Sequence, residues 1–195
     1  MNFSGREARE RAKVKADEIK ALSVSSQGIS FVPLDNEGQP LMNAICWLDR
    51  RAESQVGKIE DKFTNEEIFH HTGRRIDAIY TLPKLLWLRE NKMRLFEQTN
   101  KFLMAEDYLL YKFTRKFITD HSLASGSLLY DIQGTNWSSK LLDEFSIPRE
   151  KLPNLEWSGI VVGEIDDEIA EETGLEVGTL AVLGGQDQKC AALGL

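Results

Sequence analysis

The sequence predicts an α/β domain in which helices cover the faces of a sheet. Short apolar or β-branched runs alternate with segments of helical spacing along the 195 residues. Hydrophobic residues make up 42% of the chain and charged residues 28%, which is enough for a domain with a real buried core. Near the C-terminus an apolar run leads through two glycines to Asp187, an arrangement that places reactive side chains at the carboxyl edge of such a sheet.

The predicted elements follow one another in a regular order. Apolar and β-branched runs predict strands at residues 19–25, 29–34, 41–47, 128–130, 160–162 and 180–183. Helical spacing predicts helices at residues 4–18, 65–71, 81–91, 105–113, 138–145, 166–173 and 188–193. One further helix follows a polar break at 48–52 and ends at residue 60, and the chemistry of residues 35–38 predicts a turn.

Residues that cap helices support several of these boundaries. Ser4 is expected to cap the first helix, with Glu7 completing a capping box. Thr81 is expected to cap the helix over 81–91, and Ser138 the helix over 138–145. Gly174 stands where a helix C-terminus favours a left-handed residue.

The stretch from residue 180 to 194 carries the clearest candidate for chemistry. Gly184 and Gly185 are expected to turn the backbone sharply where a Cβ would clash. Asp187 then stands at the start of the helix over 188–193, where free N–H groups and the helix dipole favour a carboxylate. From this stretch alone, a reactive carboxylate and a simple helix cap are equally well supported.

Other polar side chains have less specific interpretations. Asp49 and Arg50 could form a buried ion pair or contact a ligand, although a surface pair is favoured about two to one. His70 and His71 are adjacent, so their side chains do not face each other, and no third ligand lies near. We therefore expect no metal site. Lys84 lies among apolar residues and is expected to extend its amine to the surface.

The composition excludes several classes of protein. The net charge is −7 and the pI is about 5.1, so neither a nucleic-acid partner nor an anionic membrane is expected. Two distant cysteines, Cys46 and Cys190, suit a reducing compartment. The N-terminus lacks the apolar core of a signal peptide, and no apolar run reaches membrane length. A cytoplasmic protein is expected.

A series of short motifs, in a fixed order, resembles one known family. The motifs are Ser25-Ser-Gln27, Asn43-Ala-Ile-Cys-Trp47-Leu-Asp49-Arg50-Arg51-Ala52, Thr81-Leu-Pro-Lys84-Leu-Leu-Trp87-Leu-Arg-Glu90-Asn91, Asp107-Tyr108, Thr119-Asp120, Ala124-Ser125-Gly126, Leu152-Pro153, Val162-Gly163, Thr173-Gly174-Leu175 and Gly184-Gly185-Gln186-Asp187-Gln188. Together they resemble the N-terminal domain of the FGGY carbohydrate kinases, which include xylulokinase, glycerol kinase, gluconate kinase and ribulokinase. The resemblance covers residues 19–195.

This resemblance implies an actin-like, ribonuclease-H-like α/β domain, with sugar and ATP bound in a cleft between two such domains. It implies phosphoryl transfer from MgATP to a hydroxyl of a sugar or polyol, which depends on positioning and charge stabilisation. Asp187 maps onto the general base, a role compatible with helix capping. Gln27, Gly28, Ile29 and Gln188 map onto the substrate site.

The sequence also departs from the family pattern. It contains no Asp-x-Gly-Thr phosphate loop, and the second domain of the family is expected to be absent. Residues 1–195 are therefore expected to be a partial, sugar-facing domain that is inactive alone. Gly28 and Ile29 stand where xylulokinases tend to carry Met-His and glycerol kinases Arg-Glu, so the substrate pocket matches neither.

Three functions follow from these observations. The first is a xylulokinase-like sugar kinase represented by part of its chain, and the second is a module that binds a sugar or a partner without catalysis. The third is a non-functional remnant. Because a first strand of the family's sheet is missing, an exposed sheet edge is expected to favour self-association.

Overall fold

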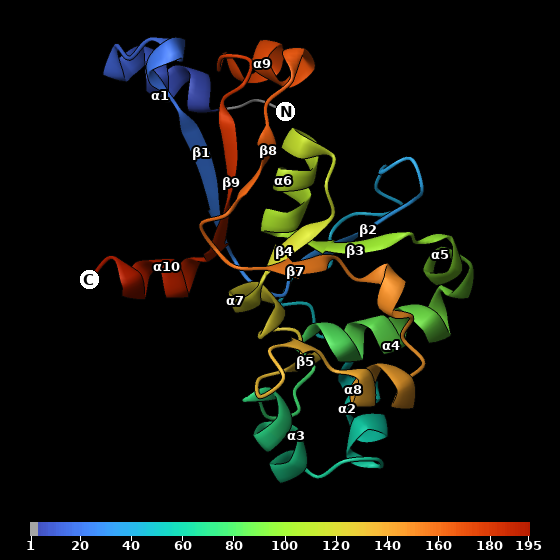
Figure 1. Cartoon of the computed structure of the whole chain (residues 1–195). Helices are drawn as coiled ribbons and strands as arrows, with labels where there is room; N and C mark the ends of the chain where they lie inside the picture. The colour runs from blue at the N-terminus through green and yellow to red at the C-terminus, as the bar shows by residue number, and fades with distance from the viewer. Residues whose placement is uncertain (1–3) are drawn as a thin grey trace.

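The computed structural model describes residues 4–195, with side chains from residue 6 onward, as a mixed α/β chain (Figure 1). Its helices are α1 (Ser4–Ala12), α2 (Glu53–Glu60), α3 (Asn65–Thr72), α4 (Thr81–Asn91), α5 (Met93–Gln98), α6 (Ala105–Thr114), α7 (His121–Ala124), α8 (Ser139–Glu144), α9 (Asp167–Thr173) and α10 (Asp187–Leu193). Its strands are β1 (Ala21–Ser26), β2 (Phe31–Leu34), β3 (Lys101–Met104), β4 (Ile118–Asp120), β5 (Tyr130–Asp131), β6 (Asn136–Trp137), β7 (Asn154–Glu156), β8 (Val161–Glu164) and β9 (Leu180–Gln186).

The largest sheet has the order β1-β9-β8. Strand β9 runs parallel to β1, from Ala21 opposite Leu180 to Ser26 opposite Gln186, and antiparallel to β8. Alternate residues of β9 are buried, as its apolar side chains face the core and pack against α6. The remaining strands form three pairs, β2 with β3, β4 with β7, and β5 with β6.

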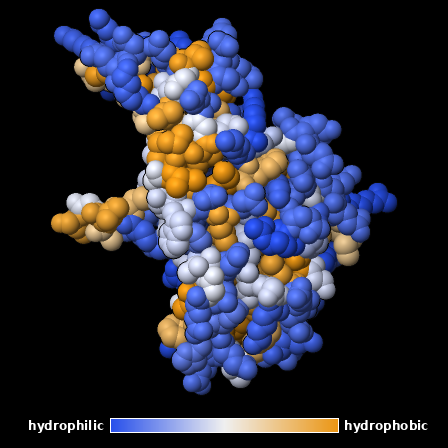
Figure 2. Space-filling model, in the orientation of Figure 1, coloured by the Kyte–Doolittle hydropathy of each residue, from blue (hydrophilic) through white to orange (hydrophobic). Residues whose placement is uncertain are grey.

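Apolar side chains form separate clusters in the two halves of the molecule. The larger cluster lies among α2, α3, α4, α5 and α8, around leucines such as Leu82, Leu85 and Leu88. A second cluster joins α6 and α9 to β8 and β9. Helix α10 has no buried residue and projects from the body of the chain, with Leu193 90% exposed. Figure 2 shows this apolar helix and a second apolar area at the level of β1 and β9.

Most predicted elements are confirmed, and several boundaries shift by a few residues. Ser138 caps α8 by accepting the N–H of Leu141 at 3.1 Å, and Gly174 ends α9 with φ of 74°. The prediction for Thr81 was wrong, because Tyr80 takes the cap position and Thr81 is the first residue of α4. The predicted Ser4 cap lies outside the described side chains.

The predicted strand over 41–47 was also wrong. Residues 40–47 pair with the main chain of β2 only through two isolated bridges, Ile45 with Phe31 and Pro40 with Leu34. Within residues 41–47 only Leu41 and Ile45 donate main-chain N–H groups to β2, to the carbonyls of Pro33 at 2.9 Å and Phe31 at 2.8 Å, and Pro33 has no N–H to donate in return, so the strand that pairs with β2 is β3. The segment therefore crosses β2 as an irregular loop that ends at the exposed Trp47.

At Gly184 the backbone of β9 lies in close contact with the backbone of β1. The sharp turn predicted at Gly184 and Gly185 is absent, because both residues lie inside β9 and the strand continues to Gln186. The predicted clash is nevertheless real, since a Cβ on Gly184 would lie 1.9 Å from the carbonyl oxygen of Val24. Glycine is thus needed here for close backbone contact.

A layer of buried carboxyl groups lies behind β9. Glu106 accepts the N–H of Gly184 at 2.7 Å, and Asp107 accepts the N–H of Met104 at 2.9 Å. Asp120 accepts the N–H groups of Ser122 and Leu123. Burial, followed by the charge of Asp120, raises the pKa of Glu106 to about 8, and burial raises the pKa of Asp107 to about 7.

We predict that Gly184→Ala destabilises the chain by about 3 kcal/mol or more, because rigid backbone, not a mobile side chain, opposes the added methyl group. Gly57→Ala is the matched control, since Gly57 lies in α2 with open space around its Cβ position. That control should gain roughly 0.5 to 1 kcal/mol. Urea denaturation measures both, and equal stability of the two variants would contradict the contact described.

We also predict that the free energy of unfolding falls between about pH 4 and pH 8. Glu106 and Asp107 have raised pKa values in the folded state, so the folded chain binds more protons than the unfolded chain across this range. The expected fall is about 2 kcal/mol or more. Glu106→Gln, which keeps the acceptor for Gly184, should flatten the slope. Denaturant titrations at several pH values test this, and a stability that rises with pH would refute it.

Candidate functional site

One cavity brings together every residue that the sequence analysis assigned to a substrate site. Its volume is about 260 Å³. The assigned residues in its lining are Gln27, Gly28, Ile29, Asp187 and Gln188. The remaining lining residues are Trp47, Arg74, Ile79, Tyr80, Gly126 and Gln186.

The parallel pairing of β1 and β9 explains this convergence. Ser26 and Gln186 are opposite each other at the carboxyl ends of the two strands. The residues that follow β1 and those that follow β9 therefore emerge at the same edge of the sheet, where ligands of open α/β sheets bind.

Asp187 is the first residue of α10, and its side chain is exposed. Its Oδ1 accepts the N–H of Gln188 at 2.7 Å. The cap position belongs to Gln186, which makes no side-chain cap bond, so the alternative of Asp187 as a simple N-cap is not supported. Its Oδ2 has no hydrogen-bond partner among the described residues, which leaves it accessible to the proton of a bound hydroxyl group.

The segment after β1 has an unusual backbone. Ser30 donates its N–H to the carbonyl of Gly28 at 2.8 Å, and Ile29 between them has φ of 58°. A left-handed conformation is a genuine outlier for a β-branched residue and costs on the order of 1–3 kcal/mol. A Cβ on Gly28 would lie 2.8 Å from Nε2 of Gln186, so glycine at this position leaves room for the Gln186 side chain.

Sequence reasoning did not identify Arg74 as part of the cavity. Its Nε donates to the carbonyl of Ser125 at 3.3 Å, and it forms no ion pair with any described residue. Arg74 follows the left-handed Gly73 at the end of α3, and no motif marks it. Trp47 and Ile79, by contrast, lie within or beside quoted motifs, which could have indicated them.

Lys84 does not reach the surface, so the sequence expectation for it was wrong. The side chain is fully buried, and its ammonium group donates to the carbonyls of Cys46 at 2.8 Å, Trp47 at 3.1 Å and Ile79 at 2.8 Å. Burial lowers the pKa of Lys84 to about 8, although the carboxylate of Asp49 acts in the opposite direction.

Asp49 and Arg50 do not pair with each other, contrary to one sequence interpretation. Asp49 pairs with Arg51 at 2.6 Å, and Arg50 pairs with Glu53, the first residue of α2. The hydrogen bond from Arg51 lowers the pKa of Asp49. Neither Asp49 nor Arg50 lines the cavity.

No candidate metal centre occurs within residues 4–195, because no group of three or more His, Cys, Asp or Glu side chains has suitable geometry there. His70 lies 3.7 Å from Glu66, whereas His71 turns away towards Ser138 and Asp131. None of the described helices is long and apolar enough to cross a membrane.

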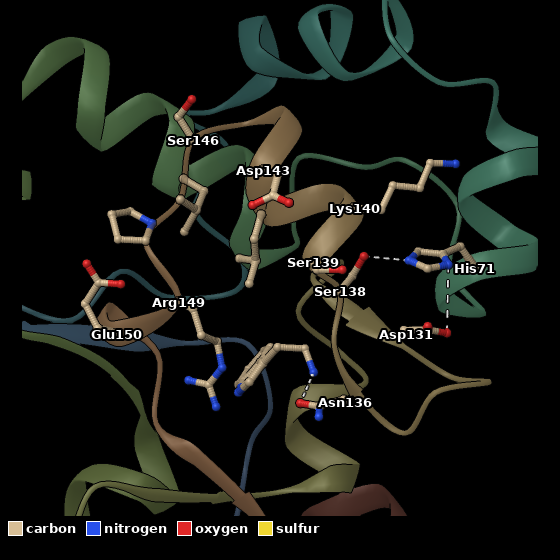
Figure 3. A pocket seen from close by; sticks show the side chains of 14 residues that line it. His71, Asp131, Asn136, Ser138, Ser139, Lys140, Asp143, Ser146, Arg149 and Glu150 are labelled. Carbon is tan, nitrogen blue, oxygen red and sulfur yellow. Dashed lines mark hydrogen bonds and ion pairs between the residues drawn. The ribbon is translucent and has the colours of Figure 1, made fainter.

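A larger groove of about 1110 Å³ contains a Ser-His-Asp arrangement (Figure 3). Nε2 of His71 lies 2.5 Å from Oγ of Ser138, and Nδ1 lies 3.8 Å from Oδ1 of Asp131. Ser138 is only 2% exposed, and its hydroxyl oxygen is occupied by the N–H of Leu141 as the cap of α8. A buried hydroxyl in this position cannot approach a substrate, so the arrangement joins α3 to α8 and is not a nucleophilic site.

Comparison with known proteins gives consistent relatives. The family model for the "FGGY family of carbohydrate kinases, N-terminal domain" matches residues 4–194. The chain is 34% identical to a xylulose kinase of Bacillus subtilis, covering 94% of this chain and 36% of that protein. It is also 34% identical to a glycerol kinase of Thermococcus gammatolerans, covering 96% of this chain and 38% of that protein.

Solved structures show the same relationship. The xylulose kinase of Lactobacillus acidophilus superposes with a TM-score of 0.89 at 28% identity, over 97% of this chain and 38% of that one. The gluconate kinase of the same organism gives a TM-score of 0.86 at 28% identity, over 94% and 37%. This chain thus spans less than two fifths of the length of these relatives, and it has their actin-like, ribonuclease-H-like α/β fold. By sequence and by fold, the chain belongs to the FGGY family of carbohydrate kinases and matches the N-terminal domain of that family.

Proposed function

We propose that this chain is the sugar-facing domain of an ATP-dependent, xylulokinase-like carbohydrate kinase, with residues 1–195 forming part of that domain. The observation that supports this most directly is the convergence of Asp187 with Gln27, Gly28 and Ile29 in one cavity at the carboxyl ends of β1 and β9. Relatives named xylulose, glycerol and autoinducer-2 kinases support a sugar or polyol as the acceptor.

In the proposed reaction Asp187 acts as the general base. The hydroxyl group of the acceptor transfers its proton to Oδ2 of Asp187 while its oxygen forms a bond to the γ-phosphorus of ATP, and ADP leaves. The free Oδ2 and the exposure of this carboxylate suit that role. Gln27 and Gln188 supply amide groups that can orient hydroxyl groups of the acceptor.

The residues of this chain do not by themselves fit the nucleotide. ATP and Mg²⁺ supply the phosphoryl group and its charge compensation in the family, yet the 195 residues contain no Asp-x-Gly-Thr phosphate loop. We therefore propose that the chain alone binds an acceptor but transfers phosphate at a negligible rate, because positioning of the γ-phosphate supplies most of the catalysis.

The alternative is a domain that binds a sugar or a partner chain without catalysis. Gly28 and Ile29 lack the polar side chains expected at these positions in xylulokinases and glycerol kinases. This difference favours the alternative in which the chain does not phosphorylate xylulose or glycerol. The two proposals differ in one respect, since only the kinase requires the proton-accepting oxygen of Asp187.

We predict that one member of a panel of D-xylulose, glycerol and gluconate raises the melting temperature of the chain. A ligand at 100 times its Kd stabilises the folded state by about 2.7 kcal/mol. Asp187→Asn should retain this stabilisation within about threefold in Kd, because the amide keeps the shape of the side chain. Coupled assays should detect negligible ADP formation with or without the substitution.

Either of two results would contradict this proposal. ADP formation that depends on the sugar and disappears in Asp187→Asn would show that the chain is active alone. If none of the three compounds stabilised the chain, the proposed acceptor site would be wrong. The chain would then be the non-functional remnant of a kinase domain.

We further propose that the chain self-associates through β1. This strand is at the edge of its sheet, and its sequence Ala-Leu-Ser-Val-Ser-Ser contains neither a charge nor a proline that would block pairing. We predict dimers or larger species in light scattering, and Ser25→Lys, a substitution at an exposed position of β1, should reduce them. A sharp monomer peak for the unmodified chain would exclude this contact.

A further inference from the structure

Lys84 is a buried cation whose hydrogen bonds are all made to main-chain carbonyls. A lysine ammonium group has three N–H donors and no acceptor. In this chain the three donors meet three acceptors, the carbonyls of Cys46, Trp47 and Ile79. Lys84 forms no ion pair within residues 4–195, so these carbonyl dipoles are its direct partners.

The acceptors belong to two segments that are far apart in the sequence. Cys46 and Trp47 end the irregular loop after β2, whereas Ile79 precedes α4. Trp47 and Ile79 both line the cavity that contains Asp187 and Gln27. The lysine thus joins two parts of the cavity wall from behind.

The surroundings of Lys84 make its positive charge costly to keep. Removing an ammonium group from water is expensive, but an apolar side chain at position 84 would leave the carbonyls of Cys46, Trp47 and Ile79 without this donor. Sidechains around Lys84 are mainly apolar, including Leu82, Leu85 and Leu88 on the same helix. The ammonium group offsets this cost because it donates a hydrogen bond to each of the three carbonyl oxygens.

We propose that Lys84 is a positioning residue for the acceptor cavity, in which its ammonium group fixes the main chain at Trp47 and Ile79. This inference rests on the proposed function, because it takes the cavity to be the acceptor site. Lys84 does not touch the acceptor. It fixes the positions of Trp47 and Ile79, which line the cavity.

The charged and titratable groups around Lys84 define how the proposal depends on pH. Asp49, Asp77 and Cys46 favour its charged form, and Arg51 opposes it. Above pH 8 a neutral amine would offer two N–H donors to three carbonyls, so one of the three carbonyls would lose its hydrogen bond. Acceptor affinity should therefore fall above pH 8.

The test compares Lys84→Met with Lys101→Met in the full chain. Lys101 is a matched control, because its amine also donates to main-chain carbonyls, those of Glu150 and Leu152, but it lies outside the cavity lining. Amide hydrogen exchange of residues 44–49 and 77–81 is measured first. Lys84→Met should accelerate exchange in both segments at least tenfold, and Lys101→Met should leave both unchanged.

Acceptor affinity is measured next, by calorimetry with the sugar that stabilises the unmodified chain. Lys84→Met should weaken it at least tenfold, whereas Lys101→Met should change it less than twofold. Lys84→Gln, which keeps two N–H donors, should fall between them and serves if Lys84→Met does not fold. Equal exchange and equal affinity for the Lys84 and Lys101 variants would overturn the proposal.

The hydrogen-exchange and affinity measurements together distinguish failure of this inference from failure of the proposed function. If the unmodified chain binds no sugar, the acceptor site is wrong, while the exchange measurement still decides whether Lys84 fixes these segments. If sugar binds and Lys84→Met leaves its Kd unchanged, the acceptor site stands and the positioning role is refuted.

Discussion

The close contact between β9 and β1 at Gly184 is the constraint on which the site depends. The carbonyl of Val24 occupies the space that a Cβ on Gly184 would need, so the two strands approach as only glycine allows. Glu106 on α6 accepts the N–H of the same glycine and joins the strand to the helix behind it. The carboxyl ends of both strands consequently meet at one edge, and the loops that follow them share one cavity.

Charge is distributed unequally around that edge. Glu106 and Asp107 on α6, behind β9, are buried with raised pKa values, and Lys84 on α4 is buried with a lowered pKa, so each of the three groups is displaced towards its neutral form. In front of them Asp187 is exposed. Burial thus disfavours the charged forms of Glu106, Asp107 and Lys84, which support the site. The carboxylate of Asp187, which is proposed to act in the reaction, remains in contact with solvent.

Local patterns predicted the parts of the fold that local forces decide. The cap at Ser138, the left-handed Gly174 and the helix after Asp187 each depend on a few adjacent residues, and all are present. The loop at 41–47 could not be predicted, because strand pairing depends on which partner β2 meets, and that partner is β3, in which Lys101 lies 67 residues after the opposite Leu34. Helical spacing likewise could not reveal three carbonyls around Lys84, since they come from distant segments.

The same limit applies to the details of the acceptor cavity. The sequence indicates Gly28 only as the loss of a polar side chain, whereas the structure shows which group uses the vacated space. A Cβ at position 28 would meet the amide of Gln186, whose Oε1 is bound by the amine of Lys189. Lys189 also donates to the carbonyl of Ser122 at 3.0 Å, so Gln186 is held in place from α7. A polar group is therefore still present beside Ile29, but it is supplied by β9 instead of by the loop after β1. In the proposed acceptor site, Gln186 and Arg74 add polar side chains to a lining in which residues 28 and 29 supply none.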